Sequence, residues 1–158
     1  MVFSSAVFLF AFLPSVLIIH TLVRNTTVRN ILLIVASLLF YAWGEPVYVL
    51  LLLASIALNF LLGRFVWGRK PVLVIAVVAN LAFLVVFKYA GFIVQSINML
   101  PFVELKVPQV RMPIGISFYT FQALSYVIDT YREKEREPGS LPDVMLYVCL
   151  FPQLVAGP

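Results

Sequence analysis

The sequence predicts an all-α fold: a polytopic integral membrane helix bundle with about five to six membrane segments. Of its 158 residues, 63% are hydrophobic and 11% are charged, whereas a soluble domain is about half apolar and about a quarter charged. The mean hydropathy is +1.05. Apolar runs long enough to approach a bilayer crossing recur along the chain. Membrane lipid is therefore expected to surround most of the surface.

Each apolar run is interpreted as one helix, because a bilayer core of roughly 30 Å needs about 20 apolar residues. The runs are 3–23, 30–43, 46–63, 71–100, 113–131 and 143–155. Pro14 removes a backbone hydrogen bond inside the first run and is expected to kink that helix. The second and sixth runs are short for a full crossing. The fourth is long for one span, so we expect it to be steeply tilted or broken near 88–91.

The basic residues fall in short loops between the apolar runs, where they set membrane orientation. The first, third and fifth loops carry Arg24 and Arg29, then Arg64, Arg69 and Lys70, then Arg132, Lys134 and Arg136. The second loop has no Lys or Arg, and the fourth has only Lys106 and Arg111. The odd loops are therefore predicted to be cytoplasmic and the N-terminus to lie outside. The net charge of +4 is thus a topology signal and predicts no nucleic-acid partner.

The run at 113–131 reads as a helix that is too polar to face lipid and too apolar to lie in water. At about 100° per residue, one side collects the residues that we call the polar stripe: Gly115, Tyr119, Gln122, Ser125, Tyr126 and Asp129. The other side carries Leu124, Val127, Ile128 and Tyr131. Because unpaired polar groups in hydrocarbon are costly, the polar stripe is expected to face other helices or a water-filled cavity.

Two interpretations of the polar stripe stay open. The first is adhesion, in which Ser, Gln and Tyr side chains bond to neighbouring helices and each bond contributes about 1 kcal/mol or less. The second is that the same side chains line a substrate passage. Asp129 could instead pair with Arg132 or Lys134 at the cytoplasmic end, outside any chemistry.

Four further polar residues lie in or beside apolar runs. Lys88 stands between "LAFLVVF" and "YAGF"; it either faces the bundle interior or a cavity, or extends its long side chain to the interface. Asn59 and Asn80 are expected to hydrogen-bond between helices rather than to bind a ligand. His20, the single histidine of the sequence, is expected at the interface and not in catalysis.

The sequence carries no Ser/His/Asp set, no HExxH pattern, no P-loop and no dinucleotide fingerprint. We therefore assign no catalytic residue and no metal ligand. Cys149, the single cysteine, excludes an intramolecular disulfide and is expected to be a buried thiol. The candidate tunnel-lining residues are Lys88, Tyr119, Gln122, Ser125, Tyr126 and Asp129.

Several strings in the sequence resemble one family. They are "MVFSSAVFLFAFLP" (1–14), "FYAW" (40–43), "FKYAGF" (87–92), "PIGISFYTFQALSYVIDTYR" (113–132) and "FPQLVAGP" (151–158). In this order they resemble the N-terminal portion of bacterial membrane-bound O-acyltransferases, and most closely the alginate O-acetyltransferase branch. The resemblance covers residues 1–158 as one portion of a multi-span domain, and its last two strings are the most specific.

The resemblance implies an O-acyltransferase of the bacterial cytoplasmic membrane. Such enzymes take acetyl from acetyl-CoA or a similar donor, which is a substrate and not a bound cofactor. They pass it to hydroxyls of an extracytoplasmic polysaccharide such as alginate, often through partner proteins. The family fold is a ring of helices around a tunnel that holds a catalytic histidine. That histidine belongs to a segment beyond the "AGP" string and His20 does not match it, so the catalytic part is expected outside these residues.

Two other functions are weighed against the acyltransferase. One is a non-catalytic transport or export subunit, whose polar stripe would line a conduit. The other is an inactive truncated fragment, because a chain of this length cannot close a tunnel. The acceptor also stays open among alginate, another exopolysaccharide, peptidoglycan and teichoic acid.

Overall fold

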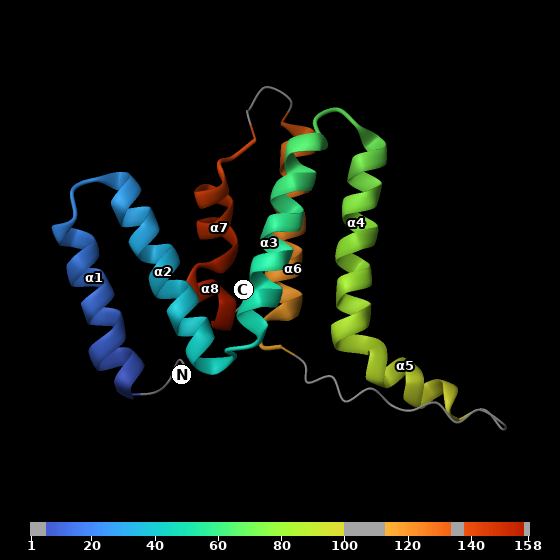
Figure 1. The fold of residues 1–158 in the computed structure, drawn as a ribbon, viewed down its shortest axis with the longest axis horizontal. Coiled ribbons are helices and arrows are strands. Elements are labelled where there is room, and N and C mark those ends of the chain that lie inside the picture. The colour runs from blue at the N-terminus through green and yellow to red at the C-terminus, as the bar shows by residue number, and fades with distance from the viewer. Residues whose placement is uncertain (1–5, 100–112, 134–137, 157–158) are drawn as a thin grey trace.

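A computed structural model describes residues 6–99, 113–133 and 138–156, and the regular elements in these ranges are all helical (Figure 1). In chain order they are η1 (Phe8–Phe12), α1 (Leu13–Leu22), α2 (Thr26–Gly44), α3 (Tyr48–Phe65), α4 (Lys70–Leu84), η2 (Val85–Tyr89), α5 (Ala90–Ile97), α6 (Ile116–Arg132), α7 (Leu141–Cys149) and α8 (Phe151–Ala156), where η marks a π-helix. The all-α prediction is confirmed.

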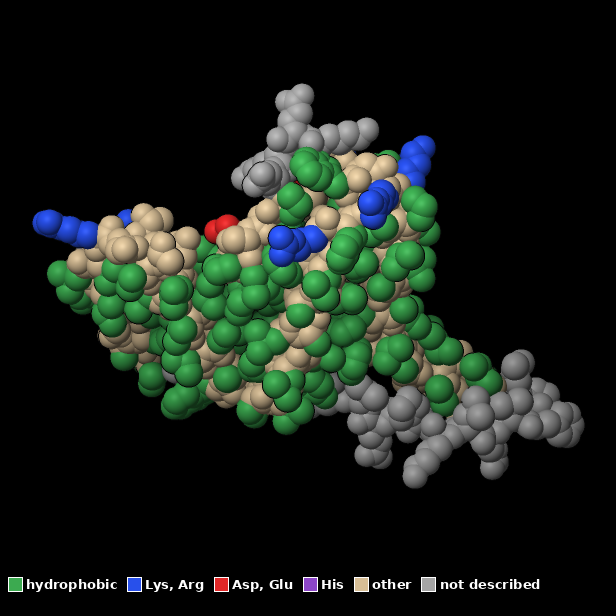
Figure 2. Space-filling view, turned by 45° about the horizontal axis from the view of Figure 1, so that its top comes forward, with side chains coloured by type: hydrophobic (Ala, Val, Ile, Leu, Met, Phe, Trp, Pro, Cys, Tyr) green, Lys and Arg blue, Asp and Glu red, His purple; other side chains and the backbone are tan. Residues whose placement is uncertain are grey.

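Among the described residues, 3 helices are long and apolar enough to cross a membrane: α2, α3 and the helix Lys70–Ile97, which combines α4, η2 and α5. The helix Phe8–Leu22 is apolar but shorter. Large apolar side chains such as Phe10, Leu22 and Leu50 are exposed on the outside, and Figure 2 shows hydrophobic side chains over most of one face. The chain is thus a multi-pass membrane protein, and the count of five to six segments stays a prediction.

The second helix is longer than the sequence indicated. Helix α2 begins at Thr26, ahead of the predicted start at Asn30. The Asn25 side chain caps it, because its Oδ1 accepts hydrogen bonds from the backbone N–H groups of Thr27 at 2.9 Å and Val28 at 3.4 Å. This cap satisfies amides that the first turn of a helix leaves unpaired. The prediction that this run is too short for a crossing was therefore wrong.

Two π-helical turns lie close to irregularities that the sequence predicted. The turn Phe8–Phe12 precedes Pro14, and the N–H of Leu13 bonds to the carbonyl of Phe8. This wider turn adjoins the residue that has no N–H to donate, while the kink expected there stays a prediction. In the fourth run, η2 separates α4 from α5, and α5 leaves the line of α4 (Figure 1). The break expected near 88–91 is confirmed.

The predicted sixth run is divided into two helices. Helix α7 begins at Leu141 and ends at Cys149, and α8 begins at Phe151. A capping box holds the start of α7: the Ser140 side chain bonds to the first turn, and the Asp143 carboxylate accepts from the Ser140 backbone N–H. With 9 residues, α7 spans about 14 Å, roughly half of a bilayer core. Cys149 is a buried free thiol, as predicted.

The loops with basic residues lie at one end of the bundle. Figure 1 places the α1–α2 and α3–α4 connections, the C-terminal end of α6 and the start of α7 at the same end, and Figure 2 shows Lys and Arg side chains along that rim. The first and third loops therefore lie at the same end, as predicted. Which side of the membrane this end faces stays a prediction. Lys106, Arg111, Lys134 and Arg136 lie outside the described residues.

Helix α6 is the centre of the packing. It contacts α3, α4 and α7. Tyr119 is fully buried in a cluster with Leu52 of α3, and Leu124 and Val127 pack with Ala76 of α4 in a second cluster. Protein thus covers Leu124 and Val127 on the side opposite the polar stripe, and it also covers Tyr119 on the polar stripe itself.

Two asparagine side chains bond to each other and join α3 to α4. Asn59 Nδ2 donates to Asn80 Oδ1 at 3.0 Å, and Asn80 Nδ2 donates to Asn59 Oδ1 at 2.8 Å. The second amide hydrogens go to the carbonyls of Ser55 and Ala76. Both asparagines are buried. The predicted interhelical role of Asn59 and Asn80 is confirmed, and every amide N–H of the pair has an acceptor.

Candidate functional site

The two most specific strings of the sequence meet at the start of α6. Gly115 caps this helix in the left-handed region, with φ +74°. A Cβ atom at Gly115 would lie 2.5 Å from the carbonyl oxygen of Leu154 in α8. Only glycine avoids both the strained backbone and this clash. The start of α6 can therefore pack against the "FPQLVAGP" string only because residue 115 is glycine.

The middle of the polar stripe bonds to α7 and α8. Gln122 Nε2 donates to the Tyr147 carbonyl and, at 2.7 Å, to Gln153 Oε1. Ser125 Oγ lies 2.9 Å from the Tyr147 hydroxyl and donates to the Gln122 carbonyl at 2.8 Å. These contacts hold three helices together at one level. They are the adhesive contacts that the first interpretation predicted.

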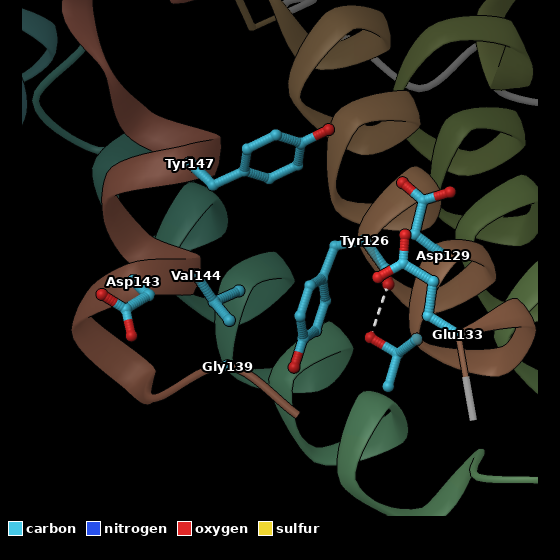
Figure 3. Close-up of a pocket in the computed structure, with 8 residues that line it drawn as sticks. Tyr126, Asp129, Glu133, Gly139, Asp143, Val144 and Tyr147 are labelled. Atoms are coloured by element: carbon cyan, nitrogen blue, oxygen red, sulfur yellow. Dashed lines mark hydrogen bonds between the residues drawn. The ribbon is translucent and has the colours of Figure 1, made fainter. Parts of the chain in front are cut away.

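The upper part of the polar stripe borders an open pocket of about 320 Å³ between α6 and α7 (Figure 3). Tyr126 stands against α3 at Gly63, where a Cβ atom would lie 2.5 Å from the tyrosine ring. Asp129 of α6, Glu133 directly after α6 and Asp143 of α7 also line the pocket. The pocket thus lies at the basic end of the bundle but is itself bordered by three carboxylates.

The charge of this pocket limits what it can bind. Carboxylates on both sides of the pocket disfavour a polyanion such as the phosphates of a nucleotide. Asp143 already caps α7. Asp129 is exposed; of its two suggested partners, Arg132 and Lys134, the second lies outside the described residues. In the described ranges, no group of three or more His, Cys, Asp or Glu residues could hold a metal ion.

The structure separates the remaining candidate tunnel-lining residues. Tyr119 is fully buried, and its ring meets Tyr41 of α2 edge-on at 6.5 Å between centroids. The pocket borders the C-terminal half of α6, whereas Lys88 lies beside the first turn of this helix. There its Nζ donates to Ser117 Oγ at 2.9 Å. The six candidates are thus distributed along the length of α6: Lys88 lies beside its first turn, Gln122 and Ser125 face α7, and Tyr126 and Asp129 border the pocket.

Some buried polar atoms of α6 have no hydrogen-bond partner among the described residues. They include the Thr120 hydroxyl, Gln122 Oε1 and the Tyr126 hydroxyl. Such atoms cost free energy unless a partner is supplied. Helix α6 thus offers both an acceptor and hydroxyl groups beyond those that its own contacts use.

Curated relatives match the chain over its whole length. The chain is 41% identical over its full length to a probable alginate O-acetylase of Pseudomonas aeruginosa, 32% of which it covers. It is 40% identical to a probable alginate O-acetylase of Azotobacter vinelandii, with 34% of that protein covered. The resemblance to membrane-bound O-acyltransferases is confirmed.

A relative with another acceptor also matches. The chain is 29% identical to the peptidoglycan O-acetyltransferase of Helicobacter pylori and covers 36% of it. The chain therefore spans about a third of the length of the curated relatives it matches. No family model and no solved structure matches it.

Sequence reasoning missed the partners that α6 uses in this homologue of O-acetylases. Tyr147 and Gln153 were not predicted, although Gln153 lies in a string that carried the resemblance. Ser37 was also missed; its Oγ donates to the Leu33 carbonyl at 2.7 Å and accepts the N–H of Phe151 at 3.1 Å. His20 pairs with Arg29, whose Nε donates to His20 Nε2 at 3.2 Å, away from the polar stripe. One signal for this contact was present in the sequence: Ser37 is a polar residue within an apolar run and therefore needs a hydrogen-bond partner.

Proposed function

We propose that the protein acts as a membrane-bound O-acetyltransferase that acetylates hydroxyls of an extracytoplasmic polysaccharide, with alginate as the favoured acceptor. The observation that carries this is the full-length identity of 41% to a probable alginate O-acetylase. The lower identity of 29% to the peptidoglycan enzyme makes alginate the first polymer to test. The curated relatives reported above are named for acetylation, so a transport or export subunit is not favoured.

The donor, location and partners belong to the same proposal. Acetyl comes from acetyl-CoA or a similar cytoplasmic thioester, and the protein lies in the bacterial cytoplasmic membrane with its N-terminus outside. Arg24 lies between α1 and α2, and Arg64 and Arg132 lie in the last turns of α3 and α6; these parts of the chain share one end of the bundle in Figure 1, which supports this orientation. Transfer to the polymer uses extracytoplasmic partner proteins. The carboxylate-lined pocket is not assigned to the donor, because its charge disfavours the phosphates of a coenzyme A group.

Within this function, the polar stripe forms part of the wall along which the acyl group passes. A passage of this kind needs an apolar bore with a few polar atoms that orient the carbonyl group. The Tyr126 hydroxyl and Gln122 Oε1 supply such atoms, since both are buried and have no partner in the described part of the chain. Lys88, Tyr119, Ser125 and Asp129 complete the proposed set; Ser125 acts by holding Tyr147.

A chimeric enzyme tests the function. The matching third of the Pseudomonas aeruginosa relative is replaced by this chain in a host that lacks its own acetylase, and acetyl esters on the secreted alginate are measured. We expect acetylation to be restored. A second chimera with Gly115→Leu, which the Leu154 carbonyl excludes, controls for packing and should fail. A well-expressed first chimera without acetyl esters contradicts the proposal.

A second experiment separates the passage from simple adhesion. Tyr126→Phe removes one hydroxyl and keeps the ring against Gly63, so we expect unchanged stability and acetyl transfer lowered several-fold. Tyr131→Phe, at a half-buried tyrosine on the other side of α6, is the matched control and should leave transfer unchanged. If both variants transfer acetyl as well as the parent does, the polar stripe serves only in helix packing and the passage interpretation is wrong.

A further inference from the structure

Helix α5 departs from the bundle at the end opposite the basic loops. Figure 1 shows it running sideways from the lower end of α4, clear of α1, α2 and α3. We propose that α5 lies flat in the membrane–water interface, with the phospholipid headgroup boundary as its partner. This inference is independent of the acetyl-transfer function, since it rests on length, direction and side-chain distribution.

The helical segment before α5 is already long enough to cross the hydrocarbon core of a bilayer. Lys70–Ile97 has 28 residues, or about 42 Å at 1.5 Å per residue, which exceeds a bilayer core of roughly 30 Å. The 15 residues of α4 and the 5 of η2 already supply about 30 Å. The change of direction at η2 therefore coincides with the point where the hydrocarbon ends.

The residues at this point are those expected at a membrane boundary. Lys88 and Tyr89 are exposed, and the Lys88 ammonium lies 5.4 Å from the centre of the Tyr89 ring. Lys88 Nζ also donates to Ser117 Oγ in the first turn of α6. Tyrosine and lysine collect at the headgroup level, where a ring stays in apolar surroundings and a charge reaches water. Lys88 is thus placed at the level of the membrane interface.

The side chains of α5 divide into an apolar and a polar side. At helical spacing, Ile93, Val94 and Ile97 share one side, and Gln95 lies on the other. Ser96 Oγ donates to the Phe92 carbonyl at 2.9 Å, so this hydroxyl needs no water. Phe92, which is 69% exposed, lies on the same side as Gln95 and Ser96, so that side is mixed while the side with Ile93 is wholly apolar. In the proposed orientation, the side with Ile93, Val94 and Ile97 lies some 5–10 Å below the headgroups and Gln95 contacts them.

Depth measurement on the intact protein in lipid vesicles tests the proposal. Single cysteines are introduced by Ile93→Cys, Gln95→Cys and Ile97→Cys, with Val78→Cys in α4 as the mid-span reference. Cys149 is fully buried, so the unmodified protein gives the labelling background. A nitroxide label at each position reports its exposure to oxygen, which enters lipid, and to a nickel complex, which stays in water.

For a flat helix, the labels at 93 and 97 lie at equal depth, the label at 95 lies closer to water, and the reference lies far deeper. A spanning helix instead gives depth that changes in one direction, by about 6 Å between 93 and 97. That result overturns the proposal, as does a helix whose labels are shielded from both reagents by protein or exposed to water alone.

Discussion

The amide pair between α3 and α4 allows a quantitative prediction. Changing Asn80 to Val removes two amide–amide bonds and leaves Asn59 with an unpaired oxygen and one unpaired N–H in a fully buried site. An interhelical hydrogen bond in a membrane contributes about 0.6–1.7 kcal/mol. Losing two such bonds lowers the free energy of unfolding by about 2 kcal/mol. The unpaired atoms of the Asn59 amide increase this loss to about 3 kcal/mol.

The double variant Asn59→Val/Asn80→Val reveals the coupling. With both amides gone, no polar atom of the pair is stranded, so we expect the double variant to be less destabilised than the sum of the two single variants. Unfolding is followed by loss of helical circular dichroism in mixed micelles during titration with dodecyl sulfate. Asn30→Val, at a half-buried asparagine of α2, is the control for the substitution itself and should cost about 0.5 kcal/mol or less. Strict additivity of the two single losses would refute the pairing.

Three further outcomes are expected in the same assay. Gly115→Ala should lower stability by more than about 1 kcal/mol, because the new Cβ combines a positive φ with the close Leu154 carbonyl; an unchanged midpoint would contradict the close contact. Gly63→Ala should cost about 1–3 kcal/mol through overpacking against Tyr126, and adding Tyr126→Leu should recover part of it; no recovery would locate the strain elsewhere. Asn25→Ala should cost about 1 kcal/mol by removing the cap of α2, and amide exchange should rise only in the first turn.

The sequence predicted those features that depend on the difference between polar and apolar side chains. Asn59 and Asn80 were assigned to interhelical bonds because an amide in lipid must find a partner, and the break at η2 followed from the excess length of one apolar run. The start of α2 was misplaced because Thr26 and Thr27 look like loop residues, while the cap that makes them helical depends on the Asn25 side chain.

The surroundings of α6 could not be predicted in the same way. A helical projection separates Gln122 from Leu124, yet lipid and a protein core are equally apolar, so the pattern does not tell which of them covers Leu124. The structure places α3 and α4 there. The partners of Gln122 lie 25 and 31 positions further along the chain, and such pairings depend on how helices assemble rather than on any local signal.

The bond from Phe151 to Ser37 joins positions 114 residues apart. Ribosomes deliver α2 to the bilayer long before α8 exists, so the first hairpin must wait there with its serine acceptor unused. This corner of the bundle is thus completed only after α8 has been made, and a protease that samples nascent membrane proteins would find the α1–α2 hairpin undocked until α8 arrives.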